Sequence, residues 1–143
     1  MAKILFAEDE EFLMQSFIWE LQDANHEVTV ARDGEEAILH LQKDNHDFGL
    51  IVLDIMLPRG SHEGVPAVGE DIKTGEMGLE VLRQLRQEMG DETPVIVLTA
   101  VIDDDLKARM LDYGVEQYFT KPTSLTDFMN AVDTALASAE LPS

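Results

Sequence analysis

Short apolar runs alternate along the chain with segments in which apolar residues recur at helical spacing. Five of these runs have the length of strands, at residues 3–7, 28–31, 48–53, 94–98 and 117–120. The run 48–53 is nearly all apolar, which is typical of a strand buried on both faces of a parallel sheet. Apolar residues three or four positions apart predict helices around residues 11–24, 37–41, 79–89, 106–110 and 125–136.

Strand and helix therefore alternate five times, without a sequence repeat. Parallel strands need crossover connections, so this alternation predicts an α/β fold with a doubly wound, five-stranded parallel sheet between helices. Ser124 and Asp127 have the spacing of a capping box at the start of the last helix. A length of 143 residues fits a single domain, which we assign to residues 1–140. With only the tail 141–143 beyond it, we expect no output domain.

Charge and composition narrow the classes of function. Acidic side chains number 29 against 10 Lys and Arg, and the resulting net charge of −19 disfavours direct binding to nucleic acid or anionic lipid. The absence of cysteine excludes disulfides and thiolate chemistry. No apolar run reaches the roughly 20 residues of a membrane span, and the apolar start is too short for a secretory signal. These features predict a cytoplasmic protein without membrane insertion.

Polar residues stand where the predicted strands end. They are Glu8 and Asp9, Asp54, Thr99 and Ala100, and Lys121. Ligands of an open α/β sheet bind beyond the carboxyl ends of its strands. We therefore expect the fold to gather three carboxylates, a hydroxyl and an ammonium in one crevice, and this convergence is the strongest functional indication in the sequence.

Such a crevice needs a compensating cation. Two carboxylates about 4 Å apart repel each other by roughly 4 kcal/mol at an effective dielectric constant of 20. Mg²⁺ relieves this repulsion and is the usual ion where one or two carboxylates meet a phosphate. The ammonium of Lys121 and the hydroxyl of Thr99 are suited to phosphoryl oxygens. These residue types together indicate a magnesium-dependent phosphoryl site.

Four segments resemble one known family. They are Ile4–Asp9, Leu50–Pro58, Leu98–Ala100 and Tyr118–Pro122. Taken in this order, each at the end of a strand, they are similar to the receiver domain of two-component response regulators, and the resemblance covers about residues 3–138. It implies the flavodoxin-like (βα)5 receiver fold with strand order 2-1-3-4-5.

The resemblance also implies roles for individual residues. Asp54 is the implied phosphoacceptor, a carboxylate nucleophile toward the phosphohistidine of a sensor histidine kinase or a phosphotransfer protein. The implied protein ligands of Mg²⁺ are Glu8, Asp9, Asp54 and the backbone carbonyl of Met56. We therefore expect a phosphoacceptor rather than an enzyme.

A conformational switch is a further implication of the resemblance. Thr99, Ala100 and Lys121 would bind the phosphoryl group, whose added charge of about −1.5 to −2 pulls on Thr99 and Lys121. Movement of Thr99 opens space for Tyr118, the switch aromatic, to turn inward and reshape the face formed by the fourth helix, fifth strand and fifth helix. A downstream protein that prefers this face then shifts the equilibrium of a stand-alone receiver.

Two other classes of function stay open at this point. A pseudo-receiver would bind partners without phosphorylation, which the complete set of site residues disfavours. An aspartyl-phosphate phosphatase would use Asp54 as a turnover nucleophile, but that chemistry commonly uses a second acid two residues later, where Met56 is apolar. Acetyl phosphate or beryllofluoride with Mg²⁺ separates the three classes by stable modification, turnover or no response.

The connection between the third strand and the third helix is unusually long. Nineteen residues lie between Pro58 and Gly78, where the family usually has a short turn. The inserted segment, residues 59–75, is rich in glycine and charge and predicts a loop. It is either a tolerated excursion or an element that gates kinase access or supplies partner specificity. Unchanged phosphotransfer rates after deletion of residues 60–74 would exclude gating.

Several residues receive no role at the site. The histidines show no ligand spacing, so we interpret positions 26, 40, 46 and 62 as solvated. Asp103 and the two acids after it open the fourth helix with a favourable charge. Core filling is the role assigned to the methionines at positions 77, 89, 110 and 129.

The residues two positions beyond Asp54 and Thr99 predict slow self-dephosphorylation. Receiver side chains at these positions border the path of the hydrolytic water, and Met56 and Val101 are apolar and cannot orient that water. We expect Met56→Asn to shorten the half-life of the phosphorylated protein, measured by following the loss of the phosphoryl group after the donor is removed. A half-life as long as that of the wild type would contradict this prediction.

Overall fold

The computed structural model describes residues 2–8, 14–43, 46–55, 77–100, 103–121 and 123–140, with side chains to residue 137. Its strands are β1 (Lys3–Ala7), β2 (Glu27–Ala31), β3 (Leu50–Leu53), β4 (Val95–Thr99) and β5 (Gln117–Thr120). Its helices are α1 (Gln15–Asp23), α2 (Gly34–Gln42), α3 (Met77–Arg83), the π-helix η1 (Gln84–Glu88), α4 (Asp104–Asp112) and α5 (Leu125–Glu140).

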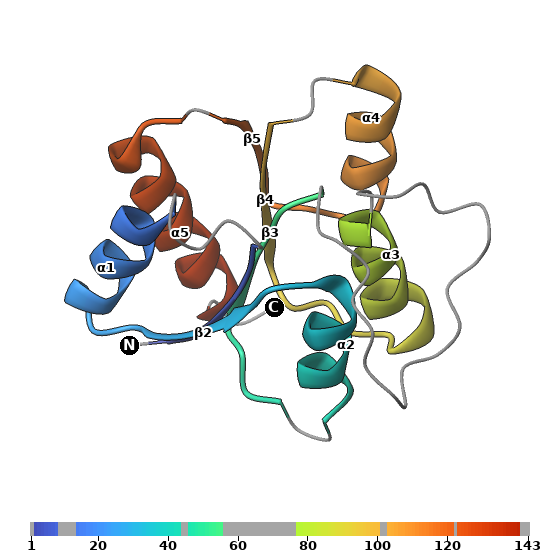
Figure 1. The fold of residues 1–143 in the computed structure, drawn as a ribbon, viewed down its shortest axis with the longest axis horizontal. Coiled ribbons are helices and arrows are strands. Elements are labelled where there is room, and N and C mark those ends of the chain that lie inside the picture. Colours follow the sequence, from blue (N-terminus) through green and yellow to red (C-terminus); the bar gives the residue numbers. More distant parts are fainter. Residues whose placement is uncertain are drawn as a thin grey trace.

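The five strands form one parallel sheet in the order β2-β1-β3-β4-β5 (Figure 1). This confirms the predicted α/β class and the strand order. Ala7 pairs with Leu53, Leu53 with Val97, and Val97 with Tyr118. Because all strands run in one direction, their carboxyl ends meet at a single edge of the sheet.

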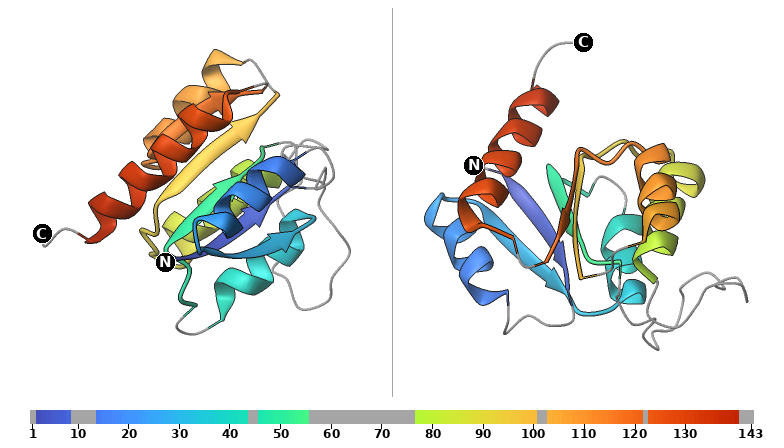
Figure 2. Two further views of the ribbon diagram at one scale, coloured as in Figure 1. Left: turned by 90° about the vertical axis from the view of Figure 1, so that its left-hand side faces the viewer. Right: turned by 90° about the horizontal axis from the view of Figure 1, so that it is seen from above.

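Helices cover both faces of the sheet. The helices α1 and α5 lie on one face, and α2, α3 and α4 lie on the other (Figures 1 and 2). Successive side chains of β1 point to opposite faces of the sheet and so contribute to both cores. Leu5 and Ala7 belong to one buried cluster, and Ile4 and Phe6 belong to the other. All four residues of β3 are buried, as the apolar run predicted for a central strand.

Local sequence signals explain where three helices begin. The Asp33 carboxylate accepts a 2.7 Å hydrogen bond from the amide of Glu36, and Asp103 accepts one of 3.1 Å from the amide of Leu106. The hydroxyl of Ser124 accepts a 3.2 Å bond from the amide of Asp127, which is half of the predicted capping box. Side-chain caps therefore set the starts of α2, α4 and α5.

The third strand is shorter than predicted. Residues 48 and 49 lie outside β3, although Phe48 is buried and belongs to the core cluster of the α2–α3–α4 face. Its ring contacts those of His40 and His46, with centroids 6.2 Å and 5.7 Å away. The apolar run continues through Phe48 because this side chain packs into the core from the connection that precedes β3.

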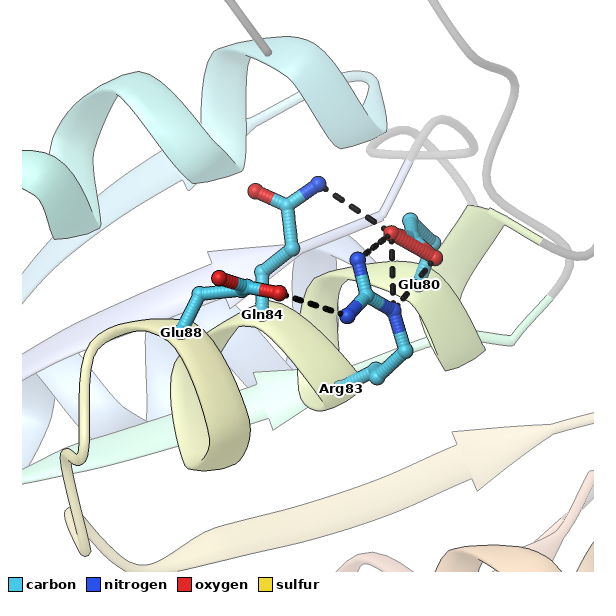
Figure 3. Close-up of polar contacts among 4 residues, drawn as sticks. All are labelled: Glu80, Arg83, Gln84 and Glu88. Carbon is cyan, nitrogen blue, oxygen red and sulfur yellow. Dashed lines mark hydrogen bonds and ion pairs between the residues drawn. The ribbon is translucent and has the colours of Figure 1, made fainter. Parts of the chain in front are cut away.

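The third helix changes from α to π geometry halfway along its length. The amide of Met89 donates to the carbonyl of Gln84, a spacing of five residues. The Arg83 guanidinium bonds the carboxylate of Glu80 and also that of Glu88, five residues on, at 3.0 Å (Figure 3). A π-turn brings residues five apart onto one face, whereas the apolar spacing 79–89 predicted an uninterrupted α-helix.

The prediction of solvated histidines is wrong for His46. Its side chain is only 10% exposed and pairs through Nε2 with the carboxylate of Asp91, 45 residues away. Burial opposes ionisation of Asp91, but hydrogen bonds from Thr93 and His46 outweigh burial and hold the pKa of Asp91 below its ordinary value. The spacing of histidines along the sequence carries no information about a partner 45 residues away.

The first turn of α3 is packed tightly against the end of β3. The amide of Gly78 donates a 3.0 Å hydrogen bond to the carbonyl of Ile55. A Cβ atom at Gly78 would lie 2.3 Å from the carbonyl oxygen of Asp54 and 2.5 Å from the Cα of Ile55. Only glycine fits this approach, so α3 begins directly against the backbone of Asp54.

Gly78→Ala is therefore expected to lower the free energy of unfolding by about 1–3 kcal/mol, because backbone atoms have to move apart. Urea unfolding of the two proteins measures the difference. Gly49→Ala is the matched control, since a Cβ there would meet its nearest neighbours at an ordinary 3.6 Å. Equal stabilities of the Gly78 and Gly49 variants would show that the approach relaxes at little cost.

Candidate functional site

Three of the predicted residues meet at the carboxyl edge of the sheet. Glu8 follows β1, Asp54 follows β3, and Lys121 follows β5. The ammonium of Lys121 donates to Glu8 Oε2 at 2.5 Å and to Asp54 Oδ2 at 3.0 Å. Residues separated by 113 and 67 positions are thus brought into one contact.

Backbone hydrogen bonds hold each of these residues one step beyond its strand. The amide of Glu8 donates to the carbonyl of Ala31 at 2.9 Å, and the amide of Asp54 donates to that of Ala7 at 3.0 Å. The amide of Lys121 donates to the carbonyl of Thr99 at 2.6 Å. Because the sheet ladder extends through the site residues themselves, their positions depend on the rigid core rather than on a loop.

The two carboxylates are almost fully buried. Glu8 is 1% exposed and Asp54 is 4% exposed, while the Lys121 side chain is 19% exposed. Burial works against the charge on Lys121, but its bond to Glu8 and the charges of both acids outweigh it and raise the pKa of Lys121 above 10.5. The ammonium therefore stays charged through neutral pH, and the stability that it contributes is lost only as the pH rises through this raised pKa.

Thr99 and Tyr118, the two other predicted switch residues, lie on the adjacent strands β4 and β5. Thr99 is the last residue of β4 and is fully buried, and Tyr118 is partly buried against the core cluster of the α2–α3–α4 face. Burial raises the pKa of Tyr118, and the carboxylates of Asp103 and Asp54 raise it further. The phenol is therefore electrostatically coupled to the charge at Asp54.

The remaining predicted residues fall in two groups. Ala100 is exposed directly after β4. Asp9, Met56 and Val101, and with them the insertion 59–75, lie outside the described residues.

The site residues that the structure does describe fit a magnesium ion. Carboxylate oxygens are hard donors, and Mg²⁺ is commonly held by one or two carboxylates together with phosphate oxygens and water. Glu8 and Asp54 supply two such carboxylates, and both already share a cation. Within the described ranges no group of three or more His, Cys, Asp or Glu residues is placed to hold a metal ion.

One feature of the site escaped sequence reasoning. The sequence pattern assigned the Lys121 ammonium to a phosphoryl oxygen. In the structure this ammonium bonds the carboxylates of Glu8 and Asp54. The net charge of −19 and the apolar runs that lead into Glu8 and Asp54 were the available signals that these acids needed a cation of the protein itself.

Comparison with known proteins identifies the family. The response regulator receiver domain family matches residues 4–133, so the chain belongs to that family and to two-component signalling. The response regulator ArlR of Staphylococcus saprophyticus is 33% identical over 129 residues, which are 90% of this chain and 50% of that protein. This chain therefore spans about half the length of the curated relatives that it matches.

Solved structures agree with this assignment. The receiver domain of the Francisella response regulator 1452 superposes with a TM-score of 0.76 at 26% identity, covering 98% of this chain and 100% of that one. The BeF3-activated DrrB receiver domain gives a TM-score of 0.70 at 26% identity, covering 96% and 98%. Among the residues described, no helix is long and apolar enough to cross a membrane.

Replacement of Lys121 tests the charge balance of the site. We expect Lys121→Met to lower the free energy of unfolding by about 2–3 kcal/mol without divalent ions, because two buried carboxylates lose the ammonium that bonds both of them. Millimolar Mg²⁺ should then stabilise this variant more than the wild type, as measured by thermal unfolding.

Lys3→Met is the matched control. Lys3 pairs with Asp47 at 2.8 Å, but the Asp47 side chain is 74% exposed, so this variant should stay close to the wild type with and without Mg²⁺. Equal responses of the two variants to Mg²⁺ would contradict a shared cation site at Glu8 and Asp54.

Proposed function

We propose that this receiver accepts a phosphoryl group on Asp54 from the phosphohistidine of a sensor histidine kinase or a phosphotransfer protein. One observation carries the proposal: a lysine ammonium lies within hydrogen-bond distance of the buried carboxylates Glu8 and Asp54 at the carboxyl edge of the sheet. Membership of the receiver family and the BeF3-activated state of the DrrB neighbour support it.

In the proposed transfer, a carboxylate oxygen of Asp54 forms a bond to phosphorus as the phosphorus–nitrogen bond of the phosphohistidine breaks. The electron pair of the broken bond goes to the imidazole nitrogen of the donor. Burial of Asp54 against rigid strands presents the nucleophile in one orientation, so little reorganisation is needed at the moment of reaction.

Mg²⁺ is the proposed cofactor, and when bound it would neutralise charge on the phosphoryl oxygens. Glu8, Asp9, Asp54 and the backbone carbonyl of Met56 are the residues proposed to hold it. Lys121 already binds Asp54 at 3.0 Å, and it would donate to a phosphoryl oxygen after transfer.

The signal then passes to the face made by α4, β5 and α5. Thr99 and Ala100 at the end of β4 would contact the phosphoryl group, and movement of Thr99 would let the ring of Tyr118 turn inward. A downstream protein that prefers the changed face would read the signal. In this proposal the chain is a phosphoacceptor with slow self-dephosphorylation, not a turnover enzyme.

Substitution of the phosphoacceptor tests the proposal. Incubated with acetyl phosphate and Mg²⁺, the wild type should gain one phosphoryl group by intact-mass spectrometry, and Asp54→Asn should gain none. Asp47→Asn is the control, because Asp47 is an exposed acid outside the site and should leave modification unchanged. Equal modification of the wild type and the Asp54 variant would exclude Asp54 as the acceptor.

Chelation of Mg²⁺ completes the test. Addition of excess EDTA should prevent modification of the wild type while its fold, followed by circular dichroism, is kept. Modification that persists without divalent ions would remove Mg²⁺ from the proposal.

A further inference from the structure

A lysine of α4 sits over the ring of the proposed switch residue. The ammonium of Lys107 lies 5.7 Å from the centroid of the Tyr118 ring, within the range of a cation–π contact. Lys107 is exposed in the second turn of α4, and Tyr118 is the second residue of β5. The contact therefore joins two of the three elements that form the proposed output face.

The surroundings leave the ring as a suitable partner for Lys107. In the described part of the chain, none of the ion pairs found involves the Lys107 side chain. Asp103, the residue that caps α4, accepts the backbone amide of Lys107 through its carbonyl oxygen at 2.9 Å. Burial, with the negative charges of Asp103 and Asp54, raises the pKa of Tyr118 further above neutrality, so the phenol is uncharged at neutral pH. A neutral, electron-rich ring in a negative environment attracts an ammonium to its face.

The contact belongs to the arrangement in which Lys121 is paired with Asp54. In that arrangement Tyr118 packs against the core cluster of the α2–α3–α4 face, and the Lys107 ammonium lies over its ring. If the ring turns inward when Asp54 is modified, its face leaves the ammonium. Any interaction made in only one of two states shifts the equilibrium toward that state.

We propose that Lys107 is a positioning residue that holds the Tyr118 ring in its unswitched place and so sets the fraction of receivers that switch. This inference rests on the proposed phosphorylation of Asp54. A partly exposed cation–π contact corresponds to about a two- to five-fold change in an equilibrium constant. Removal of the ammonium should therefore favour the switched state by that factor.

Beryllofluoride with Mg²⁺ is the probe, because a ligand that prefers the switched state binds more tightly when that state is more populated. Lys107→Met should bind beryllofluoride about two- to five-fold more tightly than the wild type, and Lys107→Arg should resemble the wild type. Lys107→Gln is a second neutral variant. The free energy of unfolding, measured in urea, should stay near that of the wild type because Lys107 is exposed.

Two controls separate the effect of the Lys107–Tyr118 contact from the effect of removing a positive charge anywhere on α4. Arg109→Met removes one cation from an exposed position of the same helix and should leave beryllofluoride affinity unchanged. In a Tyr118→Leu background, Lys107→Met should have no further effect, because the double-mutant cycle isolates the pair. The NMR signal of a ring-labelled Tyr118 should move toward its beryllofluoride-bound position in the Lys107→Met protein before ligand is added.

The possible failures are distinguishable. If the wild type binds beryllofluoride and the Lys107 and Arg109 variants match it, the role of Lys107 is wrong while the proposed function stands. An effect of Lys107→Met that persists with Leu at position 118 assigns the effect to charge elsewhere and overturns the inference. A wild type that binds no beryllofluoride overturns the proposed function and this inference together.

Discussion

The ammonium of Lys121 between the buried carboxylates of Glu8 and Asp54 is the interaction on which the site depends. Two acids buried side by side repel each other strongly, and the sheet brings them together only because a cation comes with them. The same arrangement prepares the proposed chemistry, since a positive charge beside Asp54 is what an incoming phosphoryl group requires. Stability of the resting protein and readiness for the proposed reaction would thus have one physical origin.

The position of this site is a consequence of the two buried clusters that cover the two faces of the sheet. Residues of β1 point alternately into the two helical layers, and β3 is buried on both sides, so neither strand can slide without exposing apolar side chains. Backbone hydrogen bonds then carry the ladder one residue further, into Glu8 and Asp54. The close approach of Gly78 adds a third constraint, because it sets the start of α3 against the backbone of Asp54.

Much of this could be predicted, for a definite reason. Apolar runs end where strands end, so Glu8, Asp54 and Lys121 were recognisable as candidates from their places in the chain. The extent of β3 was overestimated because Phe48 is a core residue that lies outside the strand. The π-turn of η1 has no distinct apolar period. The pairing of His46 with Asp91 could not be predicted from sequence spacing. The two residues are 45 positions apart and meet only because the connections that carry them pack together.

By itself, the sequence determined the alternation of strands and helices, the parallel class of the sheet and the chemical character of its carboxyl edge, because these follow from local periodicity and from the residues that end each run. Only the tertiary structure decided which groups share a contact: Lys121 with Glu8 as well as Asp54, and Lys107 with the ring of Tyr118. Such pairs depend on strand order, register and helix packing. These are set by burial of the whole core, so no short stretch of sequence encodes them.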